Sequence, residues 1–190
     1  MEQTELVSRF LYQYGDTGVS LLSDNELKGN YPVWFYDQEV NQHNSHWSRP
    51  VDYKQVSQFV DSLATDNSKL VFSVYAIKDN VHIGNISLQS IDHFNQTSEL
   101  ALLFGEKEYW GKGYATDSAS LIMDYAFKHL NLNRIYLGCL QSNIAMNKLA
   151  KKLGFHQEGV RRQAIFNSGT FQDVVEYGIL KDEFKNAIDR

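Results

Sequence analysis

The fold is decided by one stretch of the chain, FGEKEYWGKGYAT at residues 104–116, where an apolar segment gives way to a helix-forming one. Glycines at positions 111 and 113 permit positive-φ conformations that let successive amide N–H groups point towards one centre. The helix that follows adds unpaired N–H donors and partial positive charge at its first turn. The stretch therefore predicts a strand-to-helix turn that binds an anion such as phosphate.

Two better-known phosphate-binding motifs do not fit this turn. A Walker A loop needs a wider glycine spacing and ends in Gly-Lys-Ser/Thr, whereas Lys112 is followed by Gly113. A dinucleotide fingerprint needs a third glycine where this chain has Thr116. A plain turn that uses glycine only for its geometry stays open as an alternative at this point.

The residues before the turn predict three consecutive strands. Residues 82–90 show the clearest alternation of apolar and polar side chains, which is typical of a strand with one buried face. We expect strands at 19–22, 70–77, 82–90 and 98–104, a brief helix from Ser23 or Asp24 to about Gly29, and an amphipathic helix over 56–63.

The residues after the turn predict a long helix, a strand, a second helix and a hairpin. The long helix spans about 115–129 and carries small residues on the face that would lie on a sheet. A strand at 134–140 and a helix at 146–153 follow, and Gly154 occupies the position of a left-handed helix end. Residues 161–166 and 170–180 form a hairpin that turns at Asn167-Ser168-Gly169.

Length and composition indicate one globular unit. The chain has 190 residues, of which 43% are hydrophobic and 22% charged, so a disordered chain or a membrane protein is not expected. We expect residues 1–18 to be an N-terminal appendage and residues 19–190 to form a single domain. The sequence predicts a monomer or a homodimer.

The net charge limits the binding partners to be expected, and the cysteine content and the N-terminus indicate the cellular compartment. The formal net charge of −5 provides no global attraction for nucleic acid or an anionic membrane. The single cysteine, Cys139, lies in an apolar stretch, so we expect it to be buried and inert, and no disulfide framework is possible. The acidic N-terminus lacks the apolar run of a signal peptide, which predicts a cytoplasmic protein.

A second segment with functional character is NIAMNKLAKKLGF, residues 143–155. Asn143 is suited to cap the helix that it opens, and capping alone is a sufficient explanation for it. Asn147 follows one helical turn later and shares the same face of the helix. Lys148, Lys151 and Lys152 are interpreted as solvated surface charges.

These two segments resemble, in the right order, the two signatures of the GNAT superfamily of N-acetyltransferases, and the resemblance covers about residues 19–180. The sequence YWGKGYAT at residues 109–116 is similar to the corresponding motif of the RimJ/RimL-like branch. The phosphate loop of the superfamily corresponds to residues 108–113, with Glu108 where a basic or amide residue is usual. The resemblance implies an α/β fold of the α+β type, with a central mixed, mostly antiparallel, twisted sheet flanked by helices on both faces.

The resemblance also implies that acetyl-CoA is the cosubstrate and that a primary amine attacks it directly. The implied coenzyme contacts are Leu103, Phe104, Tyr109, Trp110, Gly111, Lys112, Gly113, Tyr114, Ala115, Thr116, Asn143 and Asn147. No metal is expected, because His43 and His46 have no clustered third ligand.

The candidate catalytic base is Glu99. It occupies a strand position where the RimJ/RimL-like branch often carries an acidic residue, and its apolar neighbours favour a raised pKa. The alternative is a solvated carboxylate near a strand end. Many relatives place a Tyr general acid directly after the residue corresponding to Leu149, but this chain has Ala150. Tyr136 and Ser142 are speculative substitutes, and a thiol with a pKa of about 8.5 is also a tolerable leaving group without one.

The acceptor site is the least determined part of the sequence. Trp34, Asn44 and His46 are candidates because they offer a stacking face and hydrogen-bonding groups, although packing of a helix explains Trp34 equally well. An Asn-Tyr-x-x-Trp opening at residues 30–34 is similar to relatives that acetylate nucleotide-linked amino sugars, which favours a sugar acceptor. A peptide N-terminus and a polyamine stay open, and so does a coenzyme-binding module that has lost catalysis.

Overall fold

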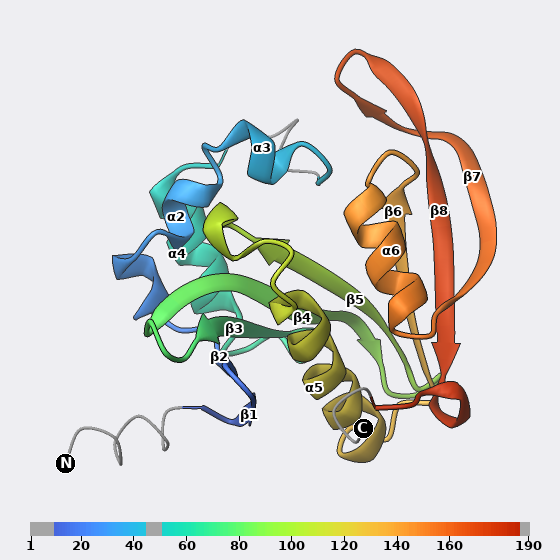
Figure 1. Cartoon of the computed structure of the whole chain (residues 1–190), viewed down its shortest axis with the longest axis horizontal. Coiled ribbons are helices and arrows are strands. Elements are labelled where there is room, and N and C mark those ends of the chain that lie inside the picture. The colour runs from blue at the N-terminus through green and yellow to red at the C-terminus, as the bar shows by residue number, and fades with distance from the viewer. Residues whose placement is uncertain (1–9, 45–50, 187–190) are drawn as a thin grey trace.

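The computed structural model describes residues 10–44 and 51–186, and a twisted sheet runs through its centre (Figure 1). Within the described residues the sheet has eight strands in the order β1-β2-β3-β4-β5-β6-β8-β7. Their bounds are Tyr12–Tyr14, Thr17–Leu21, Leu70–Ala76, Val81–Asp92, Thr97–Phe104, Arg134–Leu140, His156–Asn167 and Thr170–Leu180, from β1 to β8. Among the strands of the described residues only β5 and β6 pair in parallel, which confirms the expected mixed, mostly antiparallel sheet.

The helices connect these strands and begin and end where local chemistry permits. They are η1 (Glu26–Lys28), α2 (Tyr31–Trp34), α3 (Gln38–Asn41), α4 (Tyr53–Ser62), η3 (Lys107–Tyr109), α5 (Tyr114–Lys128), α6 (Ile144–Lys152) and η4 (Lys181–Glu183). At the start of α4, Asp52 and Gln55 form a reciprocal capping box. At the end of α6, Gly154 adopts φ +91°, as the sequence predicts.

Helices cover both faces of the sheet, as expected. Successive side chains of β3 point to opposite faces, so Phe72 joins the apolar cluster of α5, whereas Val71 joins that of α2 and α4. On α5 the side chains of Ile122 and Met123 are completely buried. Complete burial of such a side chain contributes about 1.5–3 kcal/mol, so this face of α5 fixes the helix on the sheet.

The feature that positions the site is the short contact between β5 and β6. A parallel pair needs a crossover connection, which α5 supplies. The register contains only the pairs of Thr97 with Arg134, Ser98 with Ile135, and Glu99 with Tyr136. Beyond Glu99 the two strands diverge (Figure 1), so residues 100–104 of β5 have no partner on the β6 side among the described strands.

Two parts of the sheet differ from the sequence-based expectation. The strand expected at 19–22 begins at Thr17, and Tyr12 pairs with Val19, so the expected domain boundary between Gly18 and Val19 lies inside β2. Strand β7 begins at His156 instead of residue 161. Two register irregularities interrupt its pairing with β8 and disturb the alternation that would have revealed it.

No helix in the described part of the chain has the length and apolar character that crossing a bilayer requires.

Among the described glycines, Gly105 leaves the least room for a side chain, and we predict that Gly105→Ala destabilises the fold. Its N–H donates to the Ile83 carbonyl at 3.1 Å, and an added Cβ would lie 1.9 Å from Cδ2 of Trp34. Displacing a buried indole ring costs about 1–3 kcal/mol or more, so the midpoint of urea unfolding should fall. Gly159→Ala is the matched control, because its added Cβ meets no atom within 4 Å. Equal midpoints for the two variants would contradict the packing described.

Candidate active site

The turn between β5 and α5 presents unpaired backbone donors. The N–H groups of residues 111–115 make no hydrogen bond to any described residue, whereas those of Thr116 and Asp117 donate to the Gly113 carbonyl at 2.8 and 3.0 Å. Gly111 and Gly113 adopt φ values of +72° and +101°. Five consecutive donors at a helix N-terminus match the oxygen acceptors of a pyrophosphate, so the chemistry of this turn fits the coenzyme.

The aromatic side chains of the turn hold it in shape. They donate hydrogen bonds to neighbouring segments: Tyr109 to Asp79 at 2.9 Å, Trp110 to the Phe104 carbonyl at 3.0 Å, and Tyr114 to Asp16 at 2.7 Å. The ammonium of Lys112 lies 5.2 Å from the centre of the Tyr109 ring, and its side chain is exposed. Ala115 is half-buried and Thr116 is buried. What the turn offers to a ligand is therefore its backbone and Lys112.

The second segment brings α6 beside the gap between β5 and β6. Asn143 caps α6, because its Oδ1 accepts from the Met146 N–H at 3.0 Å. The amide of Asn147 is used within the chain: it donates to the carbonyls of Asn143 and Leu140 at 2.7 and 3.1 Å. It also accepts from the Tyr177 hydroxyl at 2.8 Å. Asn147 therefore joins α6 to β6 and β8.

The end of β5 forms the other wall of this gap. The side chains of Leu103 and Phe104 pack on the two apolar clusters of the sheet, and the Phe104 ring covers the backbone of Gly84. Because residues 100–104 lack a partner strand on the β6 side, backbone groups on that edge are open to a ligand, apart from the Phe104 carbonyl, which accepts from Trp110 Nε1.

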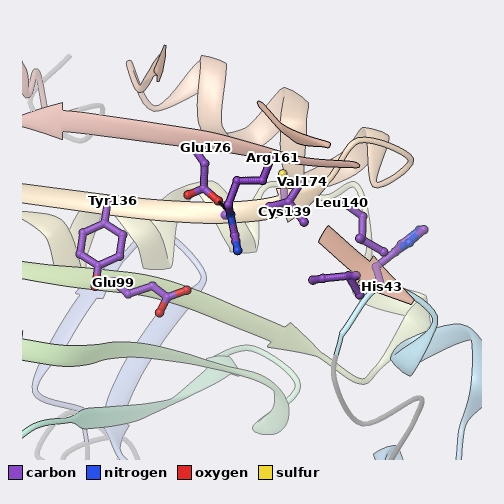
Figure 2. A pocket seen from close by; sticks show the side chains of 10 residues that line it. His43, Glu99, Tyr136, Cys139, Leu140, Arg161, Val174 and Glu176 are labelled. Atoms are coloured by element: carbon purple, nitrogen blue, oxygen red, sulfur yellow. Dashed lines mark hydrogen bonds and ion pairs between the residues drawn. The ribbon is translucent and has the colours of Figure 1, made fainter. Parts of the chain in front are cut away.

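A cavity of about 300 Å³ lies beside the gap (Figure 2). It is lined by His43, Glu99, Tyr136, Gly138, Cys139, Leu140, Arg161, Ile165, Val174 and Glu176. Glu99 enters it from β5 and Tyr136 from the facing position on β6. Burial, and then the charge of Glu176, raise the pKa of Glu99 above its ordinary value, and Arg161 partly opposes them.

The other ionisable groups of the cavity have distinct states. Arg161 Nε lies 2.5 Å from Glu176 Oε1 and forms an ion pair. Burial and the charge of Glu176 raise the pKa of Cys139 to about 11, so its thiol is protonated near neutrality and is no nucleophile. Burial lowers the pKa of His43, which favours its neutral form.

The residues proposed for the acceptor from sequence are not gathered in this cavity. Trp34 is 4% exposed, donates to Glu106 Oε1 at 2.8 Å and packs on Gly105. Its position therefore agrees with the alternative interpretation, in which Trp34 packs a helix on the sheet. Asn44 donates to Asn41 Oδ1 at 3.2 Å and is not part of the cavity lining. His46 lies outside the described residues. Among residues 10–44 and 51–186, no three His, Cys, Asp or Glu side chains gather as a metal site would require.

Sequence reasoning missed Arg161, Gly138 and Glu176. Glu176 had a signal, because it is a lone carboxylate inside the apolar strand segment 174–179. Gly138 on β6 and Arg161 on β7 carry no such signal, because only the strand order of the sheet brings them next to Glu176.

A donor-rich turn beside an open strand edge and an acidic cavity fits a coenzyme A-dependent acyltransferase. Residues 21–156 match the family model described as an acetyltransferase (GNAT) domain, and the chain belongs to the GNAT family of acetyltransferases. It is an acyltransferase that uses acetyl-CoA as its acetyl donor.

Named relatives agree with this assignment. The spermidine N(1)-acetyltransferase of Escherichia coli (strain K12) is 30% identical over 132 residues, which cover 70% of this chain and 69% of the relative. Spermidine N-acetyltransferase from Vibrio cholerae, solved with CoA and spermine, superposes with a TM-score of 0.80 at 23% identity, over 88% of this chain and 97% of the other. Ribosomal-protein-S5-alanine acetyltransferase from Vibrio fischeri gives 0.78 at 20% identity, over 92% and 98%. These two structures show the same fold.

We predict that Gly113→Ala weakens coenzyme binding. An added Cβ has room, since its nearest neighbour is Asp117 Oδ2 at 3.9 Å, but a φ of +101° strains any residue with a side chain. Relaxation of the turn would redirect its N–H groups, so the dissociation constant for CoA, measured by calorimetry, should rise about tenfold for each 1.4 kcal/mol lost. Gly169→Ala, with φ +82° at the tip of the β7–β8 hairpin and open space around it, is the matched control. Equal CoA affinity in both variants would contradict the role of the turn.

Proposed function

We propose that this protein transfers acetyl from acetyl-CoA to a primary amine of an aliphatic polyamine. The observation that carries the proposal is the charge of the cavity: the described lining holds two carboxylates, Glu99 and Glu176, against one guanidinium, Arg161. A cavity with an excess of negative charge attracts an alkylammonium ion and repels an anion. The likeness to spermidine acetyltransferases supports the same class of acceptor.

The cavity is less suited to a nucleotide-linked amino sugar, the acceptor that the sequence of residues 30–34 predicts. The diphosphate of such an acceptor needs cationic groups, and the Arg161 guanidinium in the lining is already paired with Glu176. Trp34, which would have stacked on the sugar, is buried against Gly105.

Glu99 is the base of the proposed reaction. An alkylammonium has a pKa near 10.4, so near neutral pH the amine must lose a proton before it attacks. Glu99 lies at the point where β5 and β6 part, and its raised pKa makes it a better proton acceptor than an exposed carboxylate. The coenzyme supplies the acetyl thioester, and the open edge of β5 supplies backbone N–H donors for the oxygen that gains charge.

Tyr136 is the proposed proton donor for the departing thiolate. Ala150 is completely buried and has no ionisable group, so the usual acid is absent at that position. Of the two substitutes, Ser142 donates to Gln172 Oε1 at 2.7 Å, whereas Tyr136 lines the cavity opposite Glu99.

Glu99→Gln should lower kcat by about 10²–10⁴-fold, because the amide keeps the shape of the side chain but cannot accept the proton. The dissociation constant for CoA should stay unchanged, since the phosphate turn is a separate part of the site. Because Glu99 must be ionised to act, kcat/KM of the wild-type protein should fall as the pH drops through its raised pKa. Full turnover by the variant would remove Glu99 from the mechanism.

The acceptor class is tested by measuring release of the CoA thiol with a panel of amines. Spermidine and other aliphatic diamines should give the highest kcat/KM, and amino sugars and peptides with a free N-terminus should give much lower values. Preference for a peptide would replace the polyamine by a protein N-terminus, and absence of thiol release with any amine would contradict the proposed function altogether.

A further inference from the structure

Gly138 creates a notch in β6 that Glu176 fills. The register of β6 and β8 places Gly138 opposite Glu176. A Cβ added at Gly138 would lie 3.2 and 3.4 Å from the two carboxylate oxygens of Glu176 and 3.3 Å from Val174 Cγ1, tighter than ordinary contact. The absent side chain therefore lets the Glu176 carboxylate lie over the β6 backbone, on the side that faces the cavity (Figure 2).

Arg161 holds this carboxylate from the neighbouring strand. Its Nε lies 2.5 Å from Glu176 Oε1, and its side chain is 62% exposed, whereas that of Glu176 is 30% exposed. The pairing of β7 with β8 is irregular directly after Arg161, where the Gln163 N–H donates to Asp173 Oδ1 at 2.8 Å instead of continuing the ladder. The ion pair thus consists of a half-buried anion and a cation that faces solvent.

Glu99 shares the cavity with both members of this pair. The titratable residues that line the cavity with it are Glu176 from β8, Arg161 from β7, Tyr136 and Cys139, whose thiol is protonated and packs in the core, from β6, and His43 from the segment after α3. The charges of Glu176 and Arg161 act on Glu99 in opposite directions, because a like charge disfavours the ionised carboxylate and an opposite charge favours it.

We propose that Glu176 is a positioning residue for acetyl transfer, which sets the proton affinity of Glu99 by placing a negative charge across the cavity under the control of Arg161. The inference rests on the proposed function in one respect, the role of Glu99 as the base. The carboxylate raises the affinity of that base for a proton, and the guanidinium limits the rise. The balance between the two fixes the pH at which the base becomes active.

The test is a pair of substitutions with opposite expected effects. Glu176→Gln removes the negative charge and leaves Arg161 uncompensated, so the acidic limb of the kcat/KM–pH profile should move to lower pH. Arg161→Gln leaves Glu176 uncompensated, so the same limb should move to higher pH. The double variant should return the limb towards its wild-type position, because both charges are then gone. A residue with a merely structural role would not shift the profile in opposite directions.

A readout that does not depend on turnover uses the Glu99 carboxyl group itself. Its ¹³C chemical shift, followed by NMR as a function of pH in the free protein and assigned with Glu99→Gln, should give the same two opposite shifts. Glu158→Gln is the matched control: it removes the carboxylate of another Arg–Glu pair, that of Arg134 on β6 and Glu158 on β7, which does not line the cavity. Its Glu99 titration should match that of the wild-type protein.

The outcomes separate this inference from the proposed function. Suppose that Glu99→Gln abolishes turnover but the Glu99 titration is the same in Glu176→Gln, Arg161→Gln and wild type. The positioning role of Glu176 is then wrong, and the role of Glu99 as the base stands. Shifts in the same direction for both variants also overturn the positioning role. If Glu99→Gln retains full turnover, the assignment of Glu99 as the base is wrong. The NMR titration then still decides whether Glu176 sets the proton affinity of Glu99.

Discussion

β5 and β6 run side by side for only three residue pairs, and every part of the site follows from the point where they separate. The crossover through α5 fixes the start of the pair, and the apolar clusters on both faces hold the strands beyond it. The separation leaves a backbone edge on β5, a place for α6 beside it, and a cavity at the side of β6. A fully paired sheet would have satisfied that edge and closed the access of a ligand to Glu99.

Segment 30–41 and the turn between β5 and α5 are joined by polar contacts at the start of that turn. Glu106 Oε1 accepts from Asn30 Nδ2 and Trp34 Nε1 at 2.9 and 2.8 Å. The Lys107 ammonium lies 2.8 and 2.9 Å from carboxylate oxygens of Asp37 and Glu39. The Lys107 contacts are exposed and weak in isolation, but the indole bond is partly buried and accompanies the packing of Trp34 on Gly105. The segment 30–41 is thereby held in one position relative to the turn.

The local features of this structure could be predicted from sequence, and the features that depend on strand order could not. Gly113, Asn143 and Gly154 each have a conformation or a cap that follows from the residue itself and its neighbours. Glu99 is predicted from the resemblance to the RimJ/RimL-like branch together with its apolar neighbours, and burial does raise its pKa. The cavity escaped prediction because β8 lies between β6 and β7, which brings Arg161 and Glu176 to Glu99 from distant parts of the chain. A tryptophan such as Trp34 can stack on a ligand or pack in a core, and the sequence alone does not choose between these roles. In the structure its contact with the buried Gly105 shows that it packs in the core.

The N–H groups of residues 111–115, which donate to no other described residue, have a consequence for the choice of buffer. Water must solvate them in the free protein, and any tetrahedral oxyanion of suitable size competes with that water. Inorganic phosphate and sulfate offer the same kind of oxygen acceptor as a pyrophosphate, so, on the proposed role of the turn, a buffer that contains them competes with the coenzyme. Apparent coenzyme affinities and melting temperatures depend on this choice, because any species that binds the folded state alone shifts both.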